Sequence, residues 1–137
     1  MKIVEGEICP GYGIGEYLLG DNLVNILDKI IGEYKESEEE DGSSVIMIDN
    51  AGFWFDKNKR LTQIGVTYGF LGKYCNVGIG DTLVDVKENI GSFYEEYDDY
   101  LIKGVKGLAI ALDDNDDYDS EWDEMNAPIE WIFVYKV

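Results

Sequence analysis

Histidine is absent from this chain of 137 residues, and basic residues are few, with 11 lysines and arginines against 29 aspartates and glutamates. Without histidine the chain cannot build a Ser-His-Asp or Cys-His catalytic arrangement, and it lacks the commonest ligand of zinc. The formal net charge of −18 repels phosphate backbones and anionic membrane surfaces, because binding to either relies on lysine and arginine. We therefore expect no enzymatic activity, no catalytic residue, no cofactor, and no direct contact with nucleic acid or membrane.

Cysteines and long apolar runs are also scarce. The two cysteines, Cys9 and Cys75, form no CxxC pair, and a chain of this length does not need a disulfide to be stable. We expect both to be reduced, buried thiols. No apolar run approaches the roughly 18 residues of a transmembrane helix, and the first residues lack the apolar stretch of a signal peptide. These absences predict a soluble, cytoplasmic protein.

Apolar material is nevertheless plentiful. Hydrophobic residues make up 45% of the chain and aromatic residues 13%, with three tryptophans and ten tyrosines, which is too much for a disordered acidic tail. The length fits one domain over residues 1–137. We expect a folded single domain and favour a monomer.

One short segment occurs twice. Residues 20–26 read GDNLVNI and residues 80–86 read GDTLVDV, and each copy follows a Gly-Ile-Gly and leads to a further glycine, Gly32 or Gly91. Such self-similarity is typical of a duplicated structural unit. We place one internal repeat at about 11–70 and the second at about 76–137.

Each repeat is predicted to contain a helix followed by strands. The first helix is placed at about 21–31, with Asp21 as its cap, Gly32 as its end, and an apolar stripe at helical spacing formed by Leu23, Ile26, Leu27, Ile30 and Ile31. The second is shorter, with Asp81 or Thr82 as the cap and Leu83, Val86 and Ile90 on one face. Runs typical of strands follow at 45–48, 52–56 and 61–66, and again at 100–102, 107–113 and 129–134.

The predicted fold class is therefore α+β. A helix–strand–strand–strand unit, used twice, would form one antiparallel sheet of roughly six to eight strands with two helices on one face. The last strand carries apolar residues on both sides, among them Trp131, Phe133 and Tyr135 on one side and Ile132 and Val134 on the other. Either a partner covers the helix-free face, or a strongly curved sheet buries part of both faces.

Acidic residues gather in three tracts. In the densest, carboxylates and an amide occupy the ligand places of a calcium loop, namely Asp113, Asn115, Asp117, Asp119, Glu121 and Glu124. However, Tyr118 stands where that loop needs glycine, and the flanking runs are typical of strands rather than helices. A solvated hairpin loop, an acidic docking loop and a calcium site therefore all stay open. The tract 36–44 is interpreted as an exposed connector.

In the third tract, tyrosines alternate with acidic residues. Tyrosine offers a large rigid contact area and is frequent at binding hot spots, and carboxylates steer a basic partner. A simple edge strand is the plainer interpretation. The residues predicted to bind a partner are Tyr94, Glu95, Glu96, Tyr97, Asp98 and Asp99 from this tract and Asp114, Asp116, Asp117, Tyr118, Asp119, Glu121 and Trp122 from the densest one.

The glycine pattern resembles a known class of proteins. The chain resembles small bacterial immunity proteins of contact-dependent inhibition and related polymorphic toxin systems in the order of its features. These are PGYGIG at residues 10–15, LGD at 19–21, a short helix that ends in glycine, a three-stranded run and a second Gly-Ile-Gly-Asp copy. The duplicated helix-plus-sheet unit also looks like the fold of the β-lactamase-inhibitor protein. The resemblance spans about residues 8–137. It implies a cytoplasmic protein that binds and blocks one toxin domain, commonly a nuclease, and it assigns no role to any residue.

The charge supports the same hypothesis independently. A nuclease domain presents a basic groove to its substrate, and an acidic partner with tyrosine and tryptophan can fill that groove. We therefore predict an immunity protein that neutralises the C-terminal domain of a cognate toxin, a basic nuclease, by occluding its active site. The alternative is an acidic calcium-binding or general protein-interaction domain with no toxin partner.

Overall fold

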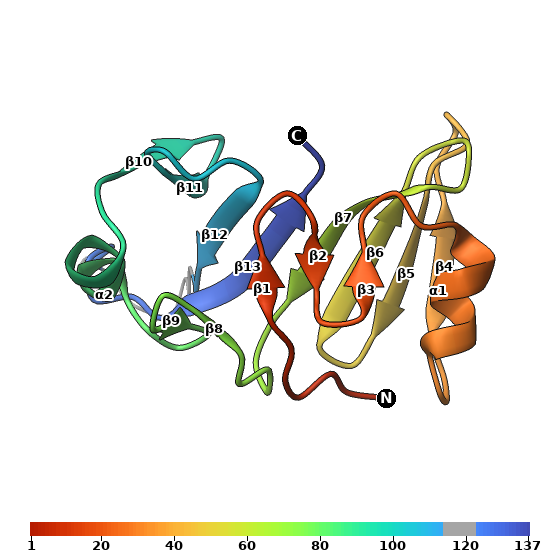
Figure 1. Ribbon diagram of the computed structural model, residues 1–137, viewed down its shortest axis with the longest axis horizontal. Helices are drawn as coiled ribbons and strands as arrows, with labels where there is room; N and C mark the ends of the chain where they lie inside the picture. The colour runs from red at the N-terminus through yellow and green to blue at the C-terminus, as the bar shows by residue number, and fades with distance from the viewer. Residues whose placement is uncertain (114–122) are drawn as a thin grey trace.

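An eight-stranded antiparallel sheet forms the framework of the computed structural model, which describes residues 1–113 and 123–137. Its two edges are formed by β10 and β4, and its centre by the neighbouring strands β13 and β7 (Figure 1). In sheet order the strands are β10 (Phe93–Glu96), β11 (Asp99–Ile102), β12 (Leu108–Leu112), β13 (Ile129–Tyr135), β7 (Leu61–Val66), β6 (Ala51–Phe55), β5 (Ser44–Ile48) and β4 (Lys35–Glu38).

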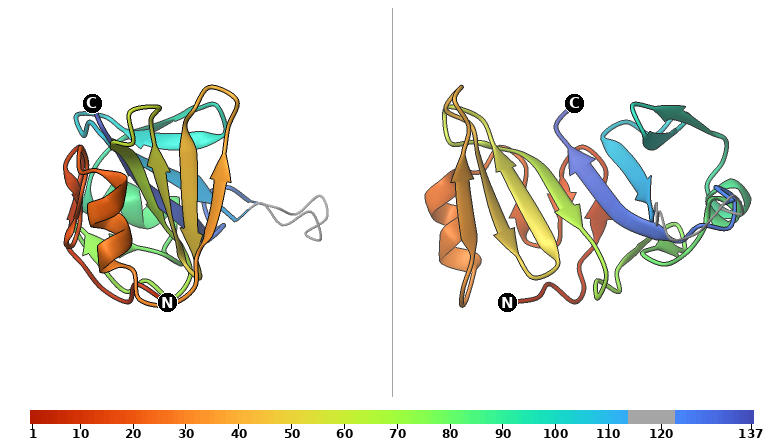
Figure 2. Two further views of the ribbon diagram at one scale, coloured as in Figure 1. Left: turned by 90° about the vertical axis from the view of Figure 1, so that its right-hand side faces the viewer. Right: turned by 180° about the vertical axis from the view of Figure 1, so that it is seen from behind.

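The smaller elements all lie on one side of this sheet (Figure 2). They are a three-stranded sheet of β1 (Ile8–Cys9), β2 (Gly13–Ile14) and β3 (Tyr17–Leu18), a two-stranded sheet of β8 (Lys73–Tyr74) and β9 (Val77–Gly78), and the helices α1 (Leu23–Lys29) and α2 (Leu83–Asn89). The core lies between these two layers, where the side chains of Ile14, Ile26, Phe53, Ile64 and Leu83 are fully buried. One face of the large sheet is therefore covered by the chain itself.

The predicted fold class is wrong. The chain is mostly strand, and its two helices have only seven residues each. They lie on the same side of the sheet but at its opposite ends (Figure 1), and the two small sheets form most of the covering layer between them. Each helix is also followed by four strands of the large sheet instead of three. The tract 36–44 is not a plain connector, because β4 occupies part of it; an edge strand needs no apolar face, and this one is exposed throughout. The third tract does contain an edge strand, β10, as its plainer interpretation has it.

The repeated Gly-Asp pairs occupy matching positions in the backbone. The N–H of Gly20 donates to the carbonyl of Leu61 at 2.7 Å, and the N–H of Leu61 donates to the carbonyl of Asp21 at 2.8 Å. Residues 80 and 81 make the same two bonds to Ile129, at 2.8 and 2.7 Å. Both glycines have φ near +90°, which a residue with a side chain rarely adopts. These bonds hold the first residues of β7 and β13 beside the two helix entries. The bounds of the two repeats stay a prediction.

The first helix is shorter than predicted. Asn22, not Asp21, caps it, and its side-chain oxygen accepts a hydrogen bond from the N–H of Asn25 at 2.8 Å. The helix ends at Lys29 because Ile30 is extended, with φ −88° and ψ 119°. Ile31 therefore points away from the core and is 80% exposed. The second helix begins after Thr82, which the sequence had offered as one of two caps.

The cysteines are free but not buried, contrary to expectation. Cys75 is exposed in the turn between β8 and β9, where its φ is +48°, and Cys9 is half-buried at the end of β1. Burial raises the pKa of the Cys9 thiol, and the charge of Glu7 raises it further. Within residues 1–113 and 123–137, neither helix approaches the length needed to cross a bilayer.

Candidate functional site

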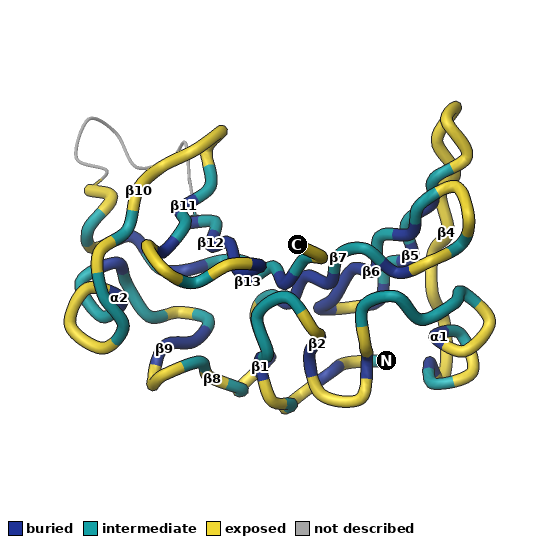
Figure 3. The backbone as a smooth tube through the Cα atoms, turned by 45° about the horizontal axis from the view of Figure 1, so that its top comes forward, coloured by how far each residue is buried: buried dark blue, intermediate teal, exposed yellow. Residues whose placement is uncertain are grey.

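The candidate site lies on the side of the eight-stranded sheet that faces away from the helices and the small sheets, which we call the open face. Successive side chains of a strand point to opposite sides, so the buried Ile132 and Val134 face the core, whereas Trp131, Phe133 and Tyr135 lie on the open face. Both ends of the sheet turn up on this side, so the open face is concave (Figure 3). Both explanations offered for the mixed pattern of the last strand thus remain open: the sheet is curved, and no second layer within residues 1–113 and 123–137 covers this face.

Aromatic rings form the floor of the open face. The ring of Phe133 stacks on that of Trp131, with centroids 5.6 Å apart and an interplanar angle of 5°, and meets the edge of Trp54 at 5.9 Å. Gly65 pairs with Phe133 across the strands. A Cβ at Gly65 would lie 2.8 Å from Cδ1 and Cε1 of Phe133, so the missing side chain lets the ring lie against the sheet. The floor is therefore half-buried although no other layer of residues 1–113 and 123–137 covers it.

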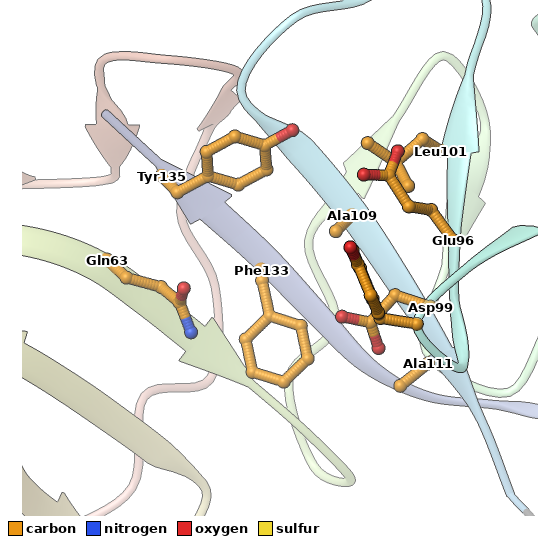
Figure 4. Close-up of a pocket in the computed structure, with 9 residues that line it drawn as sticks. Gln63, Glu96, Asp99, Leu101, Ala109, Ala111, Phe133 and Tyr135 are labelled. Carbon is orange, nitrogen blue, oxygen red and sulfur yellow. The ribbon is translucent and has the colours of Figure 1, made fainter. Parts of the chain in front are cut away.

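A hollow of about 400 Å³ lies beside this floor. Two strands give it aromatic and small side chains, and the β10–β11 hairpin adds carboxylates (Figure 4). The lining residues are Gln63 from β7, Ala109 and Ala111 from β12, Phe133 and Tyr135 from β13, and Glu96, Tyr97, Asp99 and Leu101 from the hairpin. Its volume lies within the range of about 300–1,000 Å³ that is usual for ligand pockets.

The hairpin contains the first group of residues that the sequence predicted for partner binding. Glu96 pairs with Asp99, so Tyr97 and Asp98 form a two-residue turn, with φ values of +51° and +68°. Tyr97 is 94% exposed at its tip. The structure brings Glu96, Tyr97 and Asp99 to the hollow, whereas Glu95 lies on the other face of β10, opposite Tyr100.

The two carboxylates of the hollow have no cation beside them. No ion pair formed within residues 1–113 and 123–137 includes Glu96 or Asp99, and neither lysine nor arginine lines the hollow. Burial raises the pKa of the Asp99 carboxyl, and the negative charge of Asp98 raises it further. The hollow is therefore a negatively charged site whose charge the described chain does not compensate.

The second predicted group falls outside the described residues. Its members all lie between the two described ranges: Asp114, Asp116, Asp117, Tyr118, Asp119, Glu121 and Trp122. The two ends of the predicted calcium loop are described: Oδ2 of Asp113 accepts a hydrogen bond from Tyr68 at 2.9 Å, and Oε2 of Glu124 accepts one from Tyr100 at 2.8 Å. The described part of the chain contains no group of three or more metal-binding side chains, and the calcium loop stays a prediction.

Sequence reasoning missed most of the floor. Trp131, Phe133 and Tyr135 were grouped on one side of the last strand, but they were not named as site residues, and Trp54 was not linked to them. The available signal was the alternation of aromatic residues along 131–135. Their assembly with Gly65 depends on strand order, which the sequence does not reveal.

Comparison with known proteins gives little beyond the fold. No protein-family model and no curated protein matches this chain. A solved structure of a cysteine-rich secretory protein from Staphylococcus aureus is similar, with a TM-score of 0.52 and 11% sequence identity, over 99% of this chain and 51% of that one. This chain thus spans about half the length of that protein. At this identity the likeness concerns the fold alone.

Proposed function

We propose that this protein binds a basic partner protein on the open face and blocks it, as an immunity protein that neutralises the C-terminal nuclease domain of a bacterial toxin. The observation that carries the proposal is the hollow, in which Glu96 and Asp99 stand uncompensated beside an aromatic floor. This arrangement offers a basic surface both contact area and charge. We place the protein in the cytoplasm.

The floor and the hairpin would contribute differently to binding. Aromatic side chains bury a large area and dominate the free energy of many interfaces. Carboxylates at the rim accelerate encounter with a basic surface and reject acidic ones. The chain's net charge of −18 extends this attraction beyond the hollow, although salt at about 0.15 M screens it beyond about 8 Å.

Occlusion is the proposed mechanism of inhibition. A nuclease needs a basic groove to hold phosphates, and a partner that fills the groove with carboxylates excludes the substrate without any catalytic step. This matches a chain that has no histidine. A turn such as Tyr97–Asp98, whose tip is almost fully exposed, could reach into such a groove.

The test is co-expression with the toxin domain encoded by the gene immediately upstream, followed by growth and pulldown measurements at low and high salt. We expect the protein to protect the cells and to capture that domain. Tyr97→Ala should weaken capture by at least about tenfold, as a hot-spot residue does. Tyr12→Ala is the matched control, because Tyr12 is 76% exposed but lies between β1 and β2, in the layer on the opposite side of the sheet from the open face.

Two outcomes would contradict the proposal. If the wild-type protein neither protects the cells nor captures the upstream product, the immunity function is wrong. If capture survives Tyr97→Ala and is lost with Tyr12→Ala, the protein binds its partner, but not on the open face.

A further inference from the structure

The hollow on the open face has a more specific chemistry than a general acidic surface. Glu96 and Asp99 are directly paired across β10 and β11, an arrangement that holds the Cβ atoms of opposite residues about 4.5–5.5 Å apart. Both side chains line the hollow (Figure 4). Glu96 and Asp99 therefore each contribute a carboxylate to the hollow, from directly opposite positions on two neighbouring strands.

Facing these carboxylates are aromatic and small side chains. Phe133 and Tyr135 approach the hollow from β13, and Ala109 and Ala111 leave room between that strand and the hairpin. Aromatic faces attract cations within about 6 Å of the ring centre. The hollow thus combines a negatively charged wall with an apolar, electron-rich wall.

We propose that the hollow is a subsite for one arginine side chain of the partner. The guanidinium group lies between the carboxylates of Glu96 and Asp99, and its plane rests on the rings of Tyr135 and Phe133. The proposal rests on the proposed function and names what the partner's surface must present there: an arginine on a protruding segment.

Arginine fits this site better than lysine for three reasons. Its guanidinium is planar and stacks on aromatic rings, it presents several N–H donors to two carboxylates at once, and it is less strongly hydrated than an ammonium group. Its apolar stem can also lie along the floor between Ala109 and Ala111. A lysine would also be attracted by the two carboxylates, but its ammonium group would stack less well on the aromatic rings.

The probe is a blocked tripeptide, acetyl-Gly-Arg-Gly-amide, titrated into the full-length protein and followed by NMR. We expect saturable shifts of the ring signals of Phe133 and Tyr135 and of the amides of Glu96 and Asp99. The same peptide with citrulline, which has nearly the same shape but no charge, should bind at least about tenfold more weakly. The lysine peptide should bind more weakly than the arginine peptide.

The double variant Glu96→Gln and Asp99→Asn should lower the affinity for the arginine peptide at least about tenfold. Its matched control, Asp28→Asn with Glu88→Gln, removes the same charge from exposed positions on the two helices, on the far side of the sheet. We expect the control to bind like the wild-type protein. A reduced affinity in the control equal to that in the double variant would mean that net charge alone attracts the peptide.

Three outcomes would overturn the subsite. The citrulline peptide could bind as tightly as the arginine peptide, or the lysine peptide could bind more tightly than it. The third outcome is that the arginine peptide shifts only signals of residues outside the hollow. These outcomes are distinct from failure of the proposed function. A protein that captures the upstream toxin domain but does not bind the arginine peptide in the hollow retains its immunity function and lacks the subsite. A protein that binds the peptide but captures no toxin domain retains the subsite and lacks the immunity function.

Discussion

Asp99→Asn should stabilise the free protein, although Asp99 belongs to the proposed binding site. Asp99 is half-buried and stands opposite Glu96 on the neighbouring strand, and like charges in that position destabilise a sheet by about 0.2–1 kcal/mol. Asparagine keeps the shape of the side chain and removes the charge. For a domain of this size, such a gain corresponds to a rise in Tm of up to about 4 °C.

The pH dependence follows from the direction of the pKa shift. Burial, and then the charge of Asp98, raise the pKa of Asp99 in the folded protein above its ordinary value of about 3.9. A raised pKa means that the folded state favours the neutral carboxyl, so the associated stability is present below the ordinary pKa and is lost as the pH rises through the raised pKa. The advantage of the variant should therefore be small near pH 3 and complete near pH 7.

The measurement is urea unfolding at both pH values and at low and high salt, for the wild-type protein, each single variant and the double variant with Glu96→Gln. If repulsion is the cause, the second substitution adds little to the first, and the coupling energy is about 0.2–1 kcal/mol. Asp28→Asn controls for the general effect of lowering the net charge. The reasoning is refuted if Asp99→Asn destabilises the protein at pH 7, or if its effect equals that of the control.

Three further substitutions test other parts of the fold. Gly65→Ala should cost about 1–3 kcal/mol, because the new Cβ would lie 2.8 Å from the Phe133 ring; urea unfolding measures this cost, and a loss under about 0.5 kcal/mol would show that the ring moves freely. Tyr100→Phe should cost about 1–2 kcal/mol by removing a hydroxyl that donates to a carboxylate at 2.8 Å. Because burial raises the pKa of Tyr100, the wild-type stability should fall above about pH 10, and less so in the variant. Asn50→Ala should cost about 1–3 kcal/mol and speed amide exchange in the N-terminal segment, since its buried amide bonds both backbone groups of Ile3, at 2.9 and 2.8 Å.

The inner strands were predictable because they are rich in β-branched and aromatic residues. Runs such as 61–66 and 129–134 have this composition, and the structure has β7 at Leu61–Val66 and β13 at Ile129–Tyr135. The edge strand β4 reads KESE and is exposed throughout, so its pairing with β5 leaves no apolar pattern in the sequence. The two-residue strands of the small sheets are too short to carry any periodicity.

The helices show where local signals stop being sufficient. Caps and glycines located both helices to within a few residues, because hydrogen bonds close in sequence decide where a helix begins and ends. Which face of the sheet a helix covers depends instead on how the sheet is ordered, and a helix of seven residues covers little of it. The prediction that two helices cover one face was wrong at this step, because the two small sheets form most of that layer.

For the site, composition predicted the rim, which is formed by the carboxylates of Glu96 and Asp99, but not the aromatic floor. Tyrosine and carboxylates concentrated in one tract marked Glu96 and Asp99 as candidate site residues, because that information is local, whereas their pairing in a hairpin was not predicted. Phe133, Trp54 and Gly65 meet only through the pairing of β13, β7 and β6. No local pattern encodes that pairing.

Rim and floor should therefore determine different properties of binding. The floor rings already contact one another, as the stacking of Phe133 on Trp131 shows, so a partner adds buried area without reorganising them. No ion pair within residues 1–113 and 123–137 includes the rim carboxylates of Glu96 and Asp99, and a bound cation would supply one. Since only the rim gains an interaction that the free protein lacks, substitutions of Glu96 and Asp99 should decide which partners bind. Substitutions of the floor should weaken all partners alike.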